Sequence, residues 1–313
     1  MGKFDVTVLG ELLIDMTYAG KSEAGQTLFE QNPGGAVANV AVAVGRLGGK
    51  TAFIGKVGRD MHGDFLRETL ERENVNTDSL YADESVFTTL AFVALDENGD
   101  RSFSFARKPG ADICLTKEEV PVEVIKNTKI FHTGSLSLTD EPCKTASLFA
   151  LSEAKKAGCI LSYDPNYRAP LWESEEKAVE EMRSVLSFMD IIKISDTETA
   201  LLTGAESPEE ASSILSEGGI PVVIVTLGKD GAIVRTKDGL IRTAAVSANV
   251  VDTTGAGDSF MGGFLWKVAE SGKAPAELSL EEVKEFADFA SRVAGKCVEK
   301  RGGIPSMPHI EEL

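Results

Sequence analysis

Short apolar runs alternate with amphipathic helical segments along most of the 313 residues, and this alternation limits the possible folds more than any other feature. Strands are predicted at Val6–Leu9, Thr51–Val57, Ile130–His132, Ile160–Tyr163, Ile191–Ile194 and Val222–Thr226. Helices are predicted at Ala36–Leu47, Gly63–Glu73, Cys143–Lys156, Glu175–Leu186, Asp258–Glu270 and Leu280–Cys297. Apolar strands joined by helical crossovers indicate an α/β fold, with a doubly wound, mostly parallel sheet covered by helices on both faces. Functional loops are then expected at the carboxyl ends of the strands.

One region departs from this alternation. Residues 88–95 alternate in polarity, 96–100 have the composition of a turn, and 101–105 alternate again, which predicts a β-hairpin. With segments 12–18 and 26–31 it would form a small antiparallel sheet. This sheet is either an edge decoration or a lid over a substrate, made from about residues 12–32 and 86–108. No linker divides the chain, so residues 1–313 are expected to form a single domain.

Charge and cysteine content exclude several classes of function. The net charge of −17 and the pI of 4.7 argue against nucleic acid or an anionic membrane as a partner, because both require a basic surface. No apolar run approaches the roughly 20 residues of a membrane span, and no signal-peptide pattern is present. The cysteines are far apart and form no Cys-x-x-Cys pair, so neither a zinc site nor a disulfide framework is indicated. A cytoplasmic location is predicted.

The most informative stretch is Asp252-Thr253-Thr254-Gly255-Ala256-Gly257-Asp258, which follows an extended apolar segment and opens a helix. A glycine-rich loop at a helix N-terminus presents unpaired N–H groups at the positive end of the helix dipole and so can receive phosphate oxygens. Asp258 has two interpretations. It either complements the helix dipole, or it deprotonates a hydroxyl that attacks a phosphoryl group held by the loop.

This stretch resembles the C-terminal signature of the ribokinase (PfkB) family of sugar kinases. A second family signature, Gly-Gly-x-x-x-Asn before a helix of small residues, is present at Gly34, Gly35 and Asn39, about 220 residues earlier. Within the family the chain is most similar to bacterial fructokinases, from Val6 to Pro308. The resemblance implies a ribokinase-like fold, ATP and Mg²⁺ as cofactors, Asp258 as the base, and Gly255, Ala256 and Gly257 as further catalytic residues. The N–H groups of Ala256, Gly257 and Asp258 would receive charge on the transferring phosphate.

The resemblance also assigns a sugar-binding side. The implied substrate-binding residues are Asp15, Gly34, Gly35, Asn39, Phe105, Arg107, Arg168 and Asp258. Asp15 follows the first strand, and a carboxylate suits sugar hydroxyls because it offers several acceptor sites. Arg168 is implied to reach toward the transferring phosphate, since arginine recognises planar sets of phosphate oxygens. Ala106 stands where relatives often have tyrosine, and Arg107 could meet a carboxylate instead, which keeps a keto-acid sugar open as the substrate.

The nucleotide and metal positions complete the implied site. The implied nucleotide-binding residues are Lys193, Ser195, Thr226, Gly228, Gly231, Gly255, Gly257 and Ser291. Glu198 is implied to act on Mg²⁺ through water, in keeping with the preference of this ion for one or two carboxylates and retained waters. Asp252, Thr254, Gly302 and Ser306 match the family positions for a monovalent cation, which would be K⁺.

These observations predict an ATP-dependent sugar kinase that phosphorylates the primary hydroxyl of fructose to give fructose 6-phosphate. Alternatives are a 2-keto-3-deoxygluconate kinase, another small-sugar kinase of the family, or a catalytically silent sugar-binding protein. The partners expected are the sugar and ATP, and a homodimer through the β lid is a further possibility implied by the resemblance.

Overall fold

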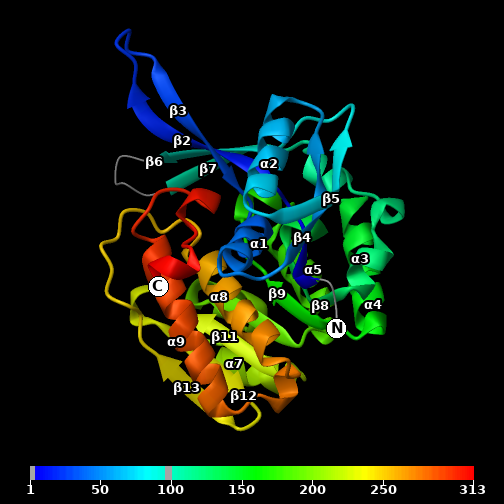
Figure 1. The fold of residues 1–313 in the computed structure, drawn as a ribbon, viewed down its shortest axis with the longest axis vertical. Helices are drawn as coiled ribbons and strands as arrows, with labels where there is room; N and C mark the ends of the chain where they lie inside the picture. The colour runs from blue at the N-terminus through cyan, green and yellow to red at the C-terminus, as the bar shows by residue number, and fades with distance from the viewer. Residues whose placement is uncertain (1–3, 96–100) are drawn as a thin grey trace.

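The computed structural model describes residues 4–95 and 101–313, and Figure 1 shows their arrangement. The strands are β1 (Phe4–Leu9), β2 (Leu13–Lys21), β3 (Thr27–Gly34), β4 (Thr51–Gly58), β5 (Val75–Asp83), β6 (Leu90–Leu95), β7 (Arg101–Ala106), β8 (Thr128–Gly134), β9 (Ile160–Asp164), β10 (Ile191–Ser195), β11 (Val222–Thr226), β12 (Ala232–Thr236) and β13 (Gly239–Thr243). The α-helices are α1 (Ala36–Arg46), α2 (Met61–Arg72), α3 (Val122–Lys126), α4 (Cys143–Ala157), α5 (Glu175–Ser184), α6 (Thr199–Thr203), α7 (Pro208–Glu217), α8 (Ala256–Ser271) and α9 (Leu280–Cys297).

Among these residues, a nine-stranded sheet runs in the order β13-β12-β11-β10-β9-β8-β1-β4-β5. The strands from β11 to β5 are parallel, and β12 and β13 add an antiparallel edge. β1 pairs with β4 on one side and with β8 on the other. The strands that follow β1 in the sequence are therefore added first on one side of it and later, from β8 onward, on the opposite side, so the strand order reverses between β1 and β8. Ligand crevices of open α/β sheets form at such a reversal, beyond the carboxyl ends of the strands.

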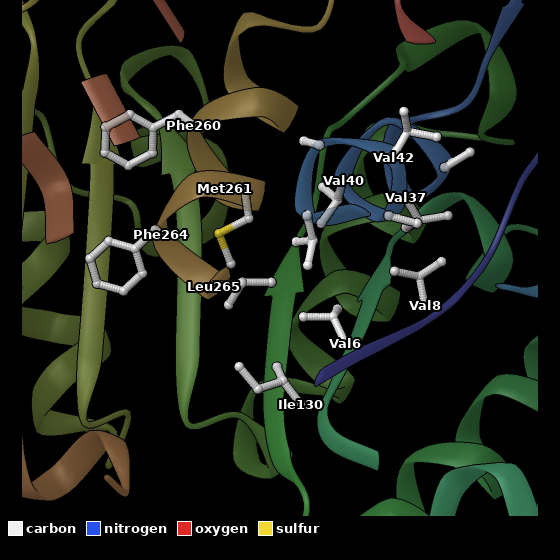
Figure 2. Close-up of a cluster of buried hydrophobic side chains, with 14 of the residues drawn as sticks. Val6, Val8, Val37, Val40, Val42, Ile130, Phe260, Met261, Phe264 and Leu265 are labelled. Atoms are coloured by element: carbon white, nitrogen blue, oxygen red, sulfur yellow. The ribbon is translucent and has the colours of Figure 1, made fainter. Parts of the chain in front are cut away.

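Helices cover both faces of this sheet, as predicted for a doubly wound fold (Figure 1). Side chains of α1, α2, α8 and α9 form one hydrophobic core, and those of α3 to α7 form the other. Because successive strand residues point to opposite faces, β11 supplies Val222 and Ile224 to the first core and Val223 and Val225 to the second. Figure 2 shows part of the first core, in which Met261 of α8 lies between the sheet and the valines of α1.

The small sheet predicted from the break in the pattern is present, with the order β3-β2-β6-β7. Its two hairpins are antiparallel, and they are joined through a parallel pairing of β2 with β6. The predicted turn at 96–100 lies outside the described residues. Register places Asp15 beside Ala91, and Ala91 beside Phe105, so these three side chains share one face of the small sheet.

Several elements have no counterpart in the sequence prediction, namely β5, α3, α6, α7 and the β12–β13 hairpin. β5 reads Val-Asn-Thr-Asp-Ser-Leu-Tyr-Ala-Asp and lies at the sheet edge, where polar residues are tolerated and the apolar signal is weak. Where prediction and structure overlap, the bounds agree closely, and Leu280–Cys297 agrees at both ends. None of the helices in the described ranges is both long and apolar enough to cross a membrane.

Candidate active site

The glycine-rich loop folds into the start of α8 through a glycine that no other residue could easily replace. Gly255 is the N-cap of α8 and adopts the left-handed conformation, with φ of 78°. A Cβ at this position would lie 2.8 Å from Cε of Met307. The side chain of Asp252 shapes the loop, because it accepts hydrogen bonds from the amides of Thr254 (2.9 Å) and Gly302 (3.1 Å). The sequence thus places Asp258 in the first turn of a long buried helix.

Asp258 receives a hydrogen bond from a helix far away in sequence. The Nδ2 atom of Asn39, on α1, donates to Oδ2 of Asp258 at 2.7 Å. Burial of the carboxyl raises the pKa of Asp258 to about 6, and the nearby charge of Asp164 acts in the same direction. Asn39, Lys193 and Arg168 oppose this rise without cancelling it. A carboxyl with such a pKa is ionised at neutral pH and still basic enough to accept a proton.

A buried ion pair lies on the other side of the loop. Lys193 of β10 contacts Asp164 of β9, with 2.5 Å between Nζ and Oδ2. Burial disfavours the charge of Lys193, but Asp164, Glu198 and Asp258 together outweigh it, and the pKa of Lys193 is raised. A Cβ on Gly257 would lie 3.2 Å from Nζ of Lys193, so the glycine lets the ammonium group approach the loop. A fixed positive charge therefore faces the loop that is predicted to hold phosphate.

These groups line a single cavity of about 680 Å³ between the carboxyl ends of the large sheet and the small sheet. Most of the predicted site residues lie on its wall: Asp15, Gly35, Asn39, Phe105, Arg168, Lys193, Ser195, Glu198, Thr226, Gly228, Asp252, Thr254, Gly255, Gly257, Asp258 and Gly302. A smaller group of predicted residues does not line it: Gly34, Arg107, Gly231, Ala256, Ser291 and Ser306. The cavity thus joins residues from both sequence signatures, which are remote along the chain.

On the predicted sugar-binding side of the cavity, other atoms lie close to the backbone of two glycines. Gly34 lies against the carboxyl of Asp15, and a Cβ there would overlap it. Gly35 has φ of 118° and lies against the carbonyl of Glu11, so a side chain at this position is excluded twice over. Gly34 therefore contacts Asp15 of the cavity wall but does not itself line the cavity.

Arg107, which is predicted from the sequence as a substrate-binding residue, does not line the cavity. It is buried, and it forms an ion pair with Asp112 at 2.7 Å. It also donates hydrogen bonds to Oγ1 of Thr139 (2.9 Å) and to the carbonyl of Leu136 (2.8 Å). The basic residue after β7 thus satisfies an internal carboxylate, a role that the sequence pattern does not separate from ligand binding.

Some of the predicted nucleotide-binding residues line the cavity, and others do not. Ser195, Thr226 and Gly228 line the cavity, whereas Ser291 is buried on α9 and Gly231 lies tightly against the carbonyl of Thr243. The amide of Ala256 donates to the carbonyl of Thr253 at 3.3 Å. Because the amide of Ala256 is already hydrogen-bonded within the loop, we expect phosphate contacts from the predicted residues that line the cavity instead.

Glu198 is the carboxylate that best suits a hydrated metal ion. It lines the cavity, and its oxygens accept hydrogen bonds from the amides of Tyr167 (2.7 Å) and Ser195 (2.8 Å). In the described part of the chain, no three His, Cys, Asp or Glu side chains cluster closely enough to bind a metal directly. One held carboxylate facing a polar cavity fits an ion that keeps most of its waters and is shared with phosphates, as Mg²⁺ does.

Sequence reasoning missed several cavity residues, notably Glu11, Asp164 and Arg301. Glu11 lies two residues beyond the end of β1 and Asp164 ends β9, so the rule that carboxyl ends of strands carry function would have found both. Arg301 reaches the rim from the C-terminal segment, near Glu30 of β3 at 3.9 Å. No sequence signal pairs these two, because their proximity depends on tertiary structure.

Comparison with known proteins identifies clear relatives. Residues 3–310 match the family described as pfkB family carbohydrate kinase. The probable fructokinase-6, chloroplastic, of Arabidopsis thaliana is 44% identical, over 98% of this chain and 81% of the relative. Fructokinase-2 of Oryza sativa subsp. japonica is 42% identical, over 97% of this chain and 91% of the relative.

Solved structures give the same result. Fructokinase from Xylella fastidiosa with bound ATP superposes with a TM-score of 0.91 at 34% identity, covering 98% of this chain and 96% of that one. Fructokinase from Vibrio cholerae O395, in a form with fructose, ADP and calcium ion, superposes with a TM-score of 0.88 at 32% identity, covering 97% and 96%.

Proposed function

The chain belongs to the pfkB family of carbohydrate kinases, and from this premise we propose that it transfers the γ-phosphoryl group of ATP to the primary hydroxyl of fructose, giving fructose 6-phosphate. The observation that carries the proposal is the pairing of Asp258 with Asn39 at 2.7 Å, at the mouth of the glycine-rich loop. This hydrogen bond connects the predicted base of one family signature to Asn39 of the other, and both residues line the same cavity. The similarity to fructokinases across 97–98% of the chain selects fructose among the sugars.

In the proposed reaction, Asp258 takes the proton of the primary hydroxyl as the oxygen forms its bond to the γ-phosphorus. The bond between that phosphorus and the β,γ-bridging oxygen breaks, and ADP leaves. Such a transfer asks the protein mainly for positioning and for stabilisation of charge. The amides of Gly257 and Asp258, the ammonium group of Lys193 and the guanidinium of Arg168 belong to residues that line the cavity, and they would stabilise the charge of the transferring phosphoryl group.

Mg²⁺ is the ion we propose to accompany ATP, with Glu198 holding it through water. When bound, it would neutralise phosphate charge. We further propose that Asp252, Thr254, Gly302 and Ser306 serve a monovalent cation, because Asp252 and its partners order the loop before Asp258. We also propose that the enzyme acts in the cytoplasm and forms a homodimer through the small sheet, which would serve as a lid.

The position of Arg107 removes the main argument for a keto-acid sugar as the substrate. That guanidinium is occupied by Asp112, so it is not available for a substrate carboxylate. The cavity instead exposes the carboxyls of Asp15 and Asp258, which suit neutral hydroxyls and repel an acid.

A coupled assay of ADP release across fructose, glucose, ribose and 2-keto-3-deoxygluconate tests the proposal. We expect the highest kcat/KM for fructose. A higher value for the keto-acid sugar would replace fructose as the substrate, and calorimetric sugar binding without ATP turnover would favour a silent binding protein.

Asp258→Asn tests the role of the base. We expect kcat to fall by at least about 100-fold with little change in KM for ATP, because the carboxylate acts in the chemical step. Asp78→Asn, an exposed change on β5, is the matched control and should leave kcat unchanged. Near-normal turnover by Asp258→Asn would remove Asp258 from the base role.

A further inference from the structure

Glu11 is a buried carboxylate in the cavity wall that the proposed reaction leaves without a task. It lies two residues beyond the end of β1, and the residue is 2% exposed. Its Oε1 atom accepts a hydrogen bond from the amide of Ala36, the first residue of α1, at 2.6 Å. The N-cap residue Gly35 makes no side-chain cap of its own, and the first turn of α1 contains no acid. Oε1 therefore satisfies a helix N–H group that would otherwise lack a partner.

The second oxygen of Glu11 is different. Among the described residues Oε2 has no hydrogen-bond partner, although it is buried. A buried acceptor left unpaired destabilises the folded protein, and more so when it is charged. Burial raises the pKa of Glu11 to about 7. The backbone amides of Glu11 itself and of Ala36 lower it, the charge of Asp112 raises it, and the charge of Arg107 lowers it. Capping α1 requires only one oxygen, so it does not explain why the chain holds a carboxylate here.

A ligand bound in the cavity would supply the missing hydrogen-bond donor for Oε2. Glu11 lines the cavity together with Asp15, Gly35, Asn39 and Asp258, four of the predicted substrate-binding residues. Hydroxyl groups of a bound sugar would be the donors in this part of the cavity, and a carboxylate oxygen is a strong acceptor for them.

We infer that Glu11 is a further sugar-binding residue, whose Oε2 atom accepts a hydrogen bond from a sugar hydroxyl other than the one phosphorylated. The inference rests on the proposed function and deepens it. A pocket that hydrogen-bonds a substrate hydroxyl discriminates strongly against analogues that lack it, because the buried group is then left unpaired. Glu11 thus contributes to the choice among neutral sugars.

Two substitutions separate this role from helix capping. Glu11→Gln keeps a carbonyl oxygen for the amide of Ala36 and replaces the free acceptor by an NH₂ donor. Glu11→Ala removes both. If Glu11 only capped α1, Gln would match the wild type and Ala alone would lower the thermal midpoint. With the sugar contact, we expect Glu11→Gln to raise KM for fructose at least 10-fold, with KM for ATP within 2-fold and the thermal midpoint nearly unchanged.

Monodeoxy analogues of fructose that retain the primary hydroxyl identify the contact. In the wild type, removal of the hydroxyl bound by Glu11 should lower kcat/KM by about 10- to 100-fold, whereas in Glu11→Gln the same removal should have little further effect. Glu181→Gln is the control: it alters a buried carboxylate paired with Lys144 and Lys177, and it should leave KM for fructose unchanged.

Wild-type turnover of fructose tests the proposed function separately. If the wild type phosphorylates fructose and Glu11→Gln has an unchanged KM for it, the inference about Glu11 fails while the function stands. If the wild type prefers another neutral sugar, the fructose assignment fails, and the same analogue test on that sugar decides the role of Glu11.

Discussion

At the scale of single residues, the surroundings of each carboxyl distinguish two aspartates of one loop. Asp258 and Asp252 lie six positions apart, and partial removal of its carboxyl from water together with the nearby charge of Asp164 raises the pKa of Asp258 to about 6. Asp252 is bound by the amides of Thr254 and Gly302, which hold it in a structural turn. Sequence proximity therefore does not predict function here, whereas the contacts and charges around each carboxyl do.

The raised pKa of Asp258 predicts the acid limb of the pH profile. Its ionised form is the base, so kcat/KM should rise with pH through about 6 and level off above it. Initial rates between pH 4.5 and 8 at saturating ATP would measure this limb. The residual activity of Asp258→Asn should lack it, and a limb centred below pH 4.5 would contradict the assignment.

The same burial predicts that Asp258→Asn stabilises the protein. The folded-state pKa lies above the ordinary 3.8, so the folded protein binds the proton more tightly and ionisation costs stability as pH rises through about 6. At about 1.4 kcal/mol per pKa unit, and allowing for contact with the cavity, we expect a gain of about 1–3 kcal/mol at pH 8. Urea unfolding at pH 8 should show this gain, and at pH 4 it should nearly vanish. Equal stability of both proteins at pH 8 would argue against a costly buried charge.

At the scale of elements, the contact between α1 and α8 positions the base. α1 carries Asn39 and α8 carries Asp258, so their hydrogen bond depends on how closely the helices pack. Gly262 of α8 allows this approach, because a Cβ there would lie 2.6 Å from Cβ of Ala43. Close-packed interiors have no spare volume to absorb such an overlap.

Gly262→Ala should therefore destabilise the protein by about 1–3 kcal/mol, and it should also lower kcat by separating α1 from α8. Gly295→Ala on α9 is the matched control. Its Cβ would meet Val246 at 3.2 Å, but Val246 is 44% exposed in a loop and can move. Gly295→Ala should be neutral or stabilising by up to about 1 kcal/mol, since alanine favours the helix. Urea unfolding and initial rates of both variants test this, and equal effects would contradict the packing argument.

At the scale of the whole molecule, the cavity exists because two sheets face each other. Asp15 and Phe105 come from the small sheet, whereas Lys193 and Asp258 come from the large sheet and its covering helix. The small sheet also carries exposed aromatic residues: Tyr18 is 41% exposed and pairs in register with Phe29, which is 40% exposed. Exposed apolar clusters of this kind often mark protein interfaces.

If the proposed homodimer forms through the small sheet, Phe29→Asp should convert it to a monomer, because a charge at a buried interface is strongly unfavourable. Phe87→Asp is the control: Phe87 is 78% exposed, lies outside the small sheet, and should leave the dimer intact. Light scattering after gel filtration would measure both masses. A monomeric wild type would refute the dimer, and loss of dimer in both variants would place the interface elsewhere.

The local sequence determined the order of most strands and helices, the small sheet and the loop that opens α8, because periodicity and glycine placement act over a few residues. It also marked most of the cavity residues through two short signatures. It did not determine whether Arg107 would face the cavity or Asp112, nor that Glu11, Asp164 and Arg301 would join the site. Those outcomes depend on which groups the fold brings together and on how far each is removed from water, and both are properties of the tertiary structure.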